Sequence, residues 1–168
     1  ANNWVHDRNH NEQQWYMASR RENSYVSGGT LNIAPASGTT GTINVDAGVS
    51  TEIGTQIVGT GSGLEKVGAG TLALTNATNT YTGDTILTAG TLNAKSDGSL
   101  GDLSSAIVFN GGTLQAGSDF SSTARTMTIN TGKAAAIDIA DPAKSLTASG
   151  VISGNGDLIK TGAGKLML

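Results

Sequence analysis

Short segments in which hydrophobic and polar residues alternate recur along most of the chain. They include Thr42-Ile43-Asn44-Val45, Thr71-Leu72-Ala73-Leu74, Met127-Thr128-Ile129 and Ile137-Asp138-Ile139. A period of two places the apolar side chains on one face of a β-strand. No segment sustains apolar residues at i, i+3, i+4 and i+7, the spacing of an amphipathic helix. The pattern therefore predicts an all-β chain with many short strands.

The alternating segments belong to an internal repeat. Gly-Thr-Leu strings and weaker glycine turns mark its units at Gly29, Gly48, Gly70, Gly90, Gly112 and Gly132. The steps between these glycines are 19, 22, 20, 22 and 20 residues. One coil of a β-solenoid has this length, and stacked coils bury aliphatic columns that no single coil could bury. We therefore expect a right-handed parallel β-helix with about 20 residues per coil.

A longer period overlies the short one. Residues 64–74 (LEKVGAGTLAL) and residues 158–168 (LIKTGAGKLML) are offset by 94 positions and identical at seven of eleven. The second copy stops at the last residue, so we expect the sequence to be a fragment of a longer protein. No signal peptide opens the chain, and no apolar run approaches the length of a membrane-spanning helix.

The composition changes sharply near Ser27. Residues 1–27 contain no glycine but hold both Trp, both His and three of the four Arg, whereas residues 28–168 contain all 24 Gly. We expect the first part to be a linker, a cap or an insertion, and the second part to be the β-helix. The aromatic residues of the first part either cover the open end of the helix or form a contact patch: Trp4, Trp15, Tyr16 and Tyr25. Capping is favoured, because an uncovered sheet edge invites aggregation.

Charge and cysteine content narrow the function classes. The net charge is −3, and the lysines are scattered among acidic residues. Nucleic-acid binding needs a concentrated basic face, so that partner is not expected. The chain has no cysteine, so packing and backbone hydrogen bonds must hold the fold without disulfides.

Residues 63–92 carry a more specific motif. It reads GLEKVGAGTLALT over 63–75, NTYTGDT over 79–85 and AGTL over 89–92. This order resembles the passenger-associated transport repeat of autotransporters, in which G-x-L-x-K-x-G-x-G-T-L-x-L precedes N-T-Y-T-G-G-T and G-T-L. Residues 157–168 match the first part only, as a truncated second copy. Asp84 stands where the family usually has a second glycine, and Asp is also tolerated in turns.

The resemblance implies the extracellular passenger of a Gram-negative bacterium, with a β-helix like that of pertactin. Such a passenger crosses the outer membrane through its own C-terminal barrel, which would tether it there and which is absent from this chain. The repeat is thought to aid export and folding, and the lack of cysteines fits, since cross-linked loops would obstruct a narrow pore. The resemblance also implies that Tyr81 packs at a corner rather than binding a ligand.

The sequence matches the known motifs of catalysis and of metal or phosphate binding only weakly. His6-Asp7-Arg8-Asn9-His10 has the spacing of the zinc motif H-E-x-x-H, but an exposed polar linker is the simpler interpretation. Residues 59–63 (GTGSG) lack the phosphate-loop pattern and predict a solenoid turn. Residues 154–157 (GNGD) lack the nine-residue calcium repeat, and no G-x-S-x-G nucleophile turn occurs. We expect no catalytic, cofactor-binding or metal-binding residues, and no cofactor.

Two functional hypotheses follow. In the first, the chain is a rigid stalk or adhesin whose partners are host surface or matrix molecules, or like passengers in self-association, as in autoaggregation or biofilm. In the second, it is the non-catalytic stalk of an autotransporter protease or esterase whose catalytic domain lies elsewhere. A carbohydrate-processing β-helix is a weaker third, because the acidic residues are not clustered.

Overall fold

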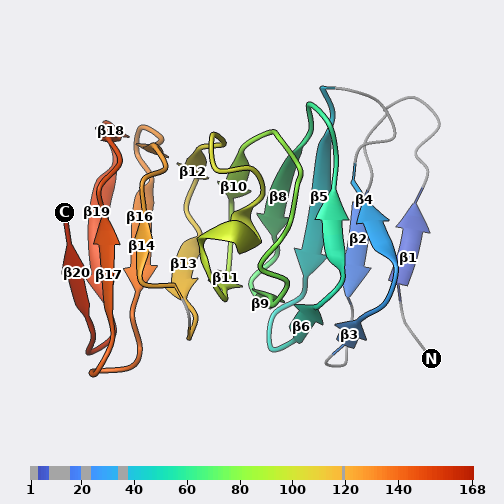
Figure 1. The fold of residues 1–168 in the computed structure, drawn as a ribbon, viewed down its shortest axis with the longest axis horizontal. Helices are drawn as coiled ribbons and strands as arrows, with labels where there is room; N and C mark the ends of the chain where they lie inside the picture. Colours follow the sequence, from blue (N-terminus) through green and yellow to red (C-terminus); the bar gives the residue numbers. More distant parts are fainter. Residues whose placement is uncertain (1–3, 8–15, 20–23, 34–37, 119) are drawn as a thin grey trace.

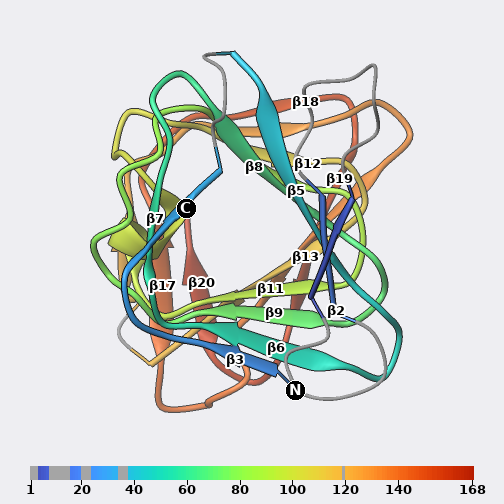
Figure 2. The same cartoon turned by 90° about the vertical axis from the view of Figure 1, so that its right-hand side faces the viewer.

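The fold is a parallel β-solenoid, as the repeat predicts. The computed structural model describes residues 4–7, 16–19, 24–33, 38–118 and 120–168. In this part of the chain the coils are stacked along the long axis, from the N-terminal to the C-terminal end (Figure 1). Each coil visits three faces in turn, which enclose a triangular interior (Figure 2).

The first sheet holds eight strands in the described part of the chain. They are β1 (Trp4–Asp7), β2 (Tyr16–Ser19), β5 (Thr40–Val45), β8 (Gly63–Val67), β10 (Thr85–Leu87), β12 (Ile107–Phe109), β15 (Met127–Ile129) and β18 (Ile152–Gly154). All neighbours pair in parallel except β1, which runs antiparallel to β2. From β5 onward, paired residues are 20 to 25 positions apart, which is one coil.

The second sheet is fully parallel and, among the residues that the structure describes, holds seven strands. They are β3 (Ser24–Val26), β6 (Ser50–Ile53), β9 (Thr71–Leu74), β11 (Thr91–Ala94), β13 (Thr113–Ala116), β16 (Ala134–Asp138) and β19 (Asp157–Thr161).

The third face is less regular. It carries two separate sheets and one short 3-10 helix: β4 (Thr30–Asn32) with β7 (Gln56–Val58), β14 (Ser122–Thr123) with β17 (Ser145–Ala148) and β20 (Lys165–Met167), and η1 (Asp97–Leu100) between them in the sequence.

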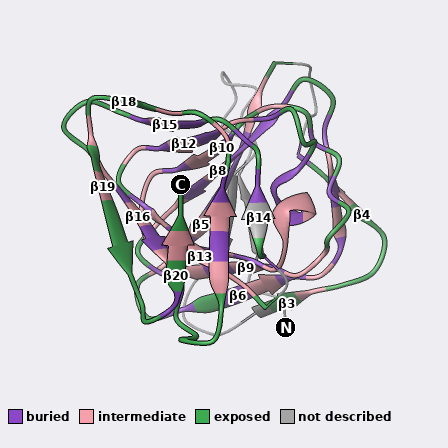
Figure 3. Ribbon diagram, turned by 60° about the vertical axis from the view of Figure 1, so that its left-hand side comes forward, coloured by how far each residue is buried: buried purple, intermediate pink, exposed green. Residues whose placement is uncertain are grey.

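Alternation within the strands builds the core. Under the second sheet, inward side chains stack in register as Leu72, Leu92, Leu114 and Ile137, all of them fully buried. Burying these aliphatic columns is the main favourable contribution to folding, at about 25 cal/mol per Å² of apolar surface. The buried positions follow the inside of the coils, whereas the last coil, from β18 to β20, is largely exposed (Figure 3).

The structure corrects one detail of the repeat. Gly70, Gly90 and Gly112 immediately precede β9, β11 and β13 of the second sheet, but Gly29 precedes β4 on the third face. The four Gly-Thr-Leu strings therefore do not form one column. The string marks a corner followed by an inward leucine, at the start of the second sheet in three coils and at the start of the third face in one.

The predicted division at Ser27 stays a prediction. The described parts of residues 1–27 are β1, β2 and β3, and β2 and β3 pair with β5 and β6 of the following coil. Tyr25 is exposed. Trp15 and His10 lie outside the described residues.

Candidate adhesive surface and its supports

A ladder of polar side chains runs along the outside of the second sheet. Strand register aligns Glu52, Ala73, Asn93, Gln115, Asp138 and Thr161, one residue from each of six successive coils. We call this row, which is polar except at Ala73, the polar ladder. A second row lies beside it, where register aligns the hydroxyl-bearing residues Ser50, Thr71, Thr91 and Thr113.

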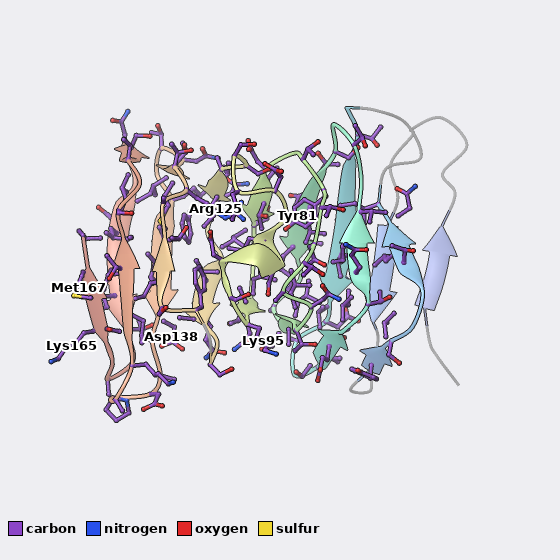
Figure 4. The ribbon with its side chains drawn as sticks, viewed as in Figure 1. Tyr81, Lys95, Arg125, Asp138, Lys165 and Met167 are labelled. Atoms are coloured by element: carbon purple, nitrogen blue, oxygen red, sulfur yellow. The ribbon has the colours of Figure 1, made fainter. Side chains whose placement is uncertain are left out.

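Hydrogen bonds connect four members of the ladder from coil to coil. The Asn93 amide donates to Oε1 of Gln115 at 2.6 Å, and the Gln115 amide donates to Oδ2 of Asp138 at 2.7 Å. The Thr161 hydroxyl donates to the other oxygen of Asp138 at 3.0 Å. Three successive contacts thus hold four side chains in fixed orientations on one face. Asp138 lies on this face toward the C-terminal end (Figure 4).

The first sheet presents a different outer surface. Glu65 accepts hydrogen bonds from the hydroxyls of Thr88 at 2.7 Å and Thr42 at 3.5 Å. Its neighbours in the next coils are Ile86 and Val108, which pair in register and are half-buried although they face outward. This face therefore combines a short polar contact with an apolar pair, and differs from the hydrogen-bonded polar row of the second sheet.

Residues of the N-T-Y-T-G motif stabilise the stacking of neighbouring coils. The Asn79 side chain accepts from the backbone amide of Ile57, one coil earlier, at 2.9 Å and donates to the carbonyl of Ser99, one coil later, at 2.7 Å. It therefore joins three coils.

Tyr81 is fully buried, as the resemblance implied, and shares a hydrogen bond of 2.7 Å with the Thr85 hydroxyl. Burial raises the pKa of the Tyr81 phenol well above its usual range, so the hydroxyl stays protonated. The predicted structural role of Tyr81 is confirmed.

Asp84, the departure from the family pattern, has a defined partner. Its carboxylate accepts the backbone amide of Ala106, in the next coil, at 2.9 Å. The carbonyl of Asp84 accepts the amide of Leu64 at 2.9 Å. The side chain adds a link between coils that a glycine could not make.

No sequence motif points to Arg125, yet among the described residues of the third face its guanidinium makes the most hydrogen bonds. It donates to Oδ1 of Asp97 and to four backbone carbonyls, those of Asp97, Gly101, Asp102 and Ser105. These groups surround η1 and the loop after it, beside Tyr81 in the central coils (Figure 4).

The loop after η1 is exposed where it extends past the residues that Arg125 contacts. Leu103 is 68% exposed, and Ser104 donates two hydrogen bonds to the Asp102 carboxylate, which lower the pKa of that carboxyl. Arg125 thus fixes a segment that projects from the third face.

Lys66 contradicts the expectation that inward side chains are apolar. It lies in register with Ile43 and Leu87 under the first sheet and is completely buried. The sequence contained the signal, because Leu64, Glu65 and Lys66 alternate and Leu64 faces inward.

Chemical motifs of the sequence are not assembled into a site in the described residues. His6 lies in β1, a strand, and its potential partner His10 lies outside the described residues. Residues 59–63 form the predicted turn. Within the described ranges, no three His, Asp or Glu side chains are placed to hold a metal ion. The described residues also include no helix that is long and apolar enough to span a membrane.

Comparison with known proteins agrees with this architecture. The passenger-associated-transport-repeat family matches residues 64–94, which contain both the K-x-G-x-G corner and the Asn79 and Tyr81 segment. A Brucella suis biovar 1 (strain 1330) protein named "Adhesin BmaC autotransporter" is 38% identical over 149 residues, which is 85% of this chain. The chain spans only 4% of the length of that relative. No solved structure matches the chain significantly.

Proposed function

Because this chain belongs to the autotransporter passengers that carry passenger-associated transport repeats, we propose that it is a rigid adhesive stalk whose contact surface is the outer face of the second sheet. An autotransporter passenger is located at the bacterial cell surface, associated with the outer membrane. The proposal assigns the chain adhesion, autoaggregation or biofilm contacts and no catalysis, in keeping with the word adhesin in the name of the Brucella relative.

The observation that carries the proposal is the polar ladder. Asn93, Gln115 and Asp138 are held by hydrogen bonds to one another, so their orientation is set before any partner arrives. Preorganised side chains lose little conformational freedom on binding, which leaves more of the contact energy for affinity. The same arrangement on one sheet face also permits many weak contacts to act together.

The chemistry of the ladder indicates the class of partner. Amides and hydroxyls both donate and accept hydrogen bonds, so a partner rich in the same groups fits better than a highly charged one. Two partners meet this description: a host surface or matrix molecule, and the same face of a like passenger. The modest net charge of −3 favours neither a nucleic acid nor a strongly charged polymer.

A bead assay tests the proposal with matched variants. The 168-residue chain is coupled to beads, and two quantities are measured: clustering of the beads and their retention on an extracellular-matrix coating. Gln115→Glu places a carboxylate against Asp138 in the ladder. Asn130→Asp makes the same amide-to-carboxylate change on the corner that follows β15 of the first sheet, where Asn130 is exposed.

We expect Gln115→Glu to reduce clustering or retention at least about tenfold, since losing about 1.4 kcal/mol of contact energy has that effect. Asn130→Asp should match the wild-type chain. Circular dichroism establishes that both variants remain folded. Equal behaviour of the two variants would remove the second sheet as the contact face. A folded wild-type chain that neither clusters nor is retained would reject adhesion itself.

A further inference from the structure

The ammonium group of Lys66 occupies a cage of backbone carbonyls inside the solenoid. Its Nζ donates to the carbonyls of Val67 and Gly68, both at 2.8 Å, and to that of Ala89 at 3.2 Å. An ammonium has three N–H donors, and each finds one acceptor here. The first acceptor is the last residue of β8, the second lies in the corner that follows it, and the third lies in the next coil.

Gly68 shapes this cage. Its φ is +76°, a conformation that L side chains rarely adopt. A Cβ at Gly68 would also lie 2.3 Å from both Asn44 Oδ1 and the Val45 carbonyl oxygen. The glycine therefore allows two consecutive carbonyls to reach one ammonium while the corner packs tightly against the previous coil.

The second copy of the motif builds the same corner at another place in the coil. Lys160 Nζ donates to the carbonyls of Thr161 at 3.2 Å and Gly162 at 2.8 Å, and the φ of Gly162 is +71°. Residues 64–74 lead from the first sheet to the second, whereas residues 158–168 lead from the second sheet to the third face. The lysine–carbonyl arrangement follows the motif and not the face.

We propose that the K-x-G-x-G corner is an ammonium-binding cage, and that the charged Lys66 side chain filling it pins the register of one coil against the next. Lys66 can fix the register between coils because its carbonyl acceptors come from two of them. A slip of one residue in β8 would turn Lys66 to the outside and bring Glu65 into the aliphatic interior. Removing the ammonium would leave three partly buried carbonyls without a donor, which is more costly than losing an exposed hydrogen bond.

Two opposing effects act on the charge. Burial of Lys66 among aliphatic neighbours disfavours the ammonium and lowers its pKa to about 8. The three carbonyl acceptors favour it. Since the pKa remains above neutral pH, the group filling the cage at pH 7 is a cation.

The first test replaces the charge and keeps the apolar stem. Lys66→Met is compared with Lys133→Met, which removes an exposed lysine between β15 and β16. Urea unfolding of the full chain at pH 7 should show an unfolding equilibrium constant at least about tenfold larger for Lys66→Met and unchanged for Lys133→Met. A Lys66→Met chain as stable as the wild type, or more stable, overturns the proposal.

The second test refills the cage from solution. Lys66→Ala lacks three methylenes and the ammonium, the shape of n-propylammonium, which is the probe. The neutral control is 1-propanol, and the protein control is Lys133→Ala under the same conditions. We expect n-propylammonium to raise the urea midpoint of Lys66→Ala alone, with 1-propanol having little effect. Equal effects of the amine and the alcohol would show that the site takes an apolar stem and not a cation, and would overturn the proposal.

Discussion

Arg125 and Asp97 form an ion pair across 28 residues of sequence, with Nε and Oδ1 2.8 Å apart, although the Arg125 side chain is almost fully buried. The ion pair joins β14 and β15 of one coil to η1 of the preceding coil. Four carbonyls around η1 take the remaining guanidinium hydrogens. A buried arginine is tolerated when its charge is paired and all its donors are used, and both conditions are met here.

Arg125→Lys should destabilise the chain by about 3 kcal/mol, because a lysine keeps the charge but cannot reproduce the planar, five-donor fork. Urea unfolding measures the loss. Asp97→Asn, which retains an acceptor at the same place, should cost less. If Arg125→Lys and Asp97→Asn have equal and small effects, the guanidinium does not organise the η1 loop as its contacts indicate.

Tyr81→Phe should lower the free energy of unfolding by about 1 to 2 kcal/mol, since it leaves the buried Thr85 hydroxyl with a weaker partner. Thr85 Oγ1 then retains only a longer contact of 3.4 Å with the carbonyl of Leu100. A double-mutant cycle with Thr85→Val isolates the interaction energy between Tyr81 and Thr85. A coupling energy near zero would mean that Tyr81 stabilises through ring packing alone.

Alternation and period predicted the architecture because they report one physical requirement. Leu72, Leu92 and Leu114 must face a dry interior in every coil, so their spacing equals the coil length. The same alternation would have placed Arg125 inside with Thr123 and Met127, which are both buried. Arginine and lysine are nevertheless expected at the surface, because they are seldom buried without specific partners.

Sequence patterns could not predict the partners of the buried Arg125 and Lys66 side chains. Asp97 lies in η1, an irregular segment of the third face, and the repeat carries no information about how that loop folds back onto Arg125. The acceptors of Lys66 are backbone carbonyls, which every residue has, so no residue type in the sequence indicates their position. The polar ladder had the same limitation, since pairing Gln115 with Asp138 requires the register between β13 and β16.

Stability should increase with pH through the range set by Lys66, because the neutral amine still donates to two carbonyls of the cage and no longer carries a buried charge. In the folded chain its pKa is lowered to about 8 from its ordinary value of 10.5. Between these values the unfolded chain binds more protons than the folded chain, so the free energy of unfolding rises with pH. The rise should be at most about 3 to 4 kcal/mol, because each tenfold difference in proton affinity between the two states corresponds to about 1.4 kcal/mol.

Urea titrations at several pH values between about 7 and 10 measure this rise, below the range in which ionisation of Tyr81 in the unfolded chain acts in the opposite direction. Lys66→Met should flatten the profile in that window, whereas Lys133→Met should leave it intact. A wild-type profile that is flat from about pH 8 to 10 would show that the carbonyls fully offset the effect of burial on the pKa of Lys66.

Asp84→Gly, which restores the residue usual in the transport repeat, should destabilise this chain by about 0.5 to 1.5 kcal/mol. The cause is specific: the Asp84 carboxylate accepts the backbone amide of Ala106, one coil later. Glycine also increases the freedom of the unfolded chain, which acts in the same direction. Asp84→Asn keeps an acceptor oxygen and should lose at most half as much.

Hydrogen exchange at the Ala106 amide distinguishes the two causes of this loss. Removing the side-chain acceptor speeds exchange at that amide, whereas a purely unfolded-state effect lowers protection throughout the cooperative unit. Asp84→Gly should therefore speed hydrogen exchange more at the Ala106 amide than at neighbouring amides. Asp84→Asn should largely preserve the protection of the Ala106 amide. Unchanged protection at Ala106 in Asp84→Gly would show that another acceptor replaces the carboxylate, and that this link between coils is dispensable.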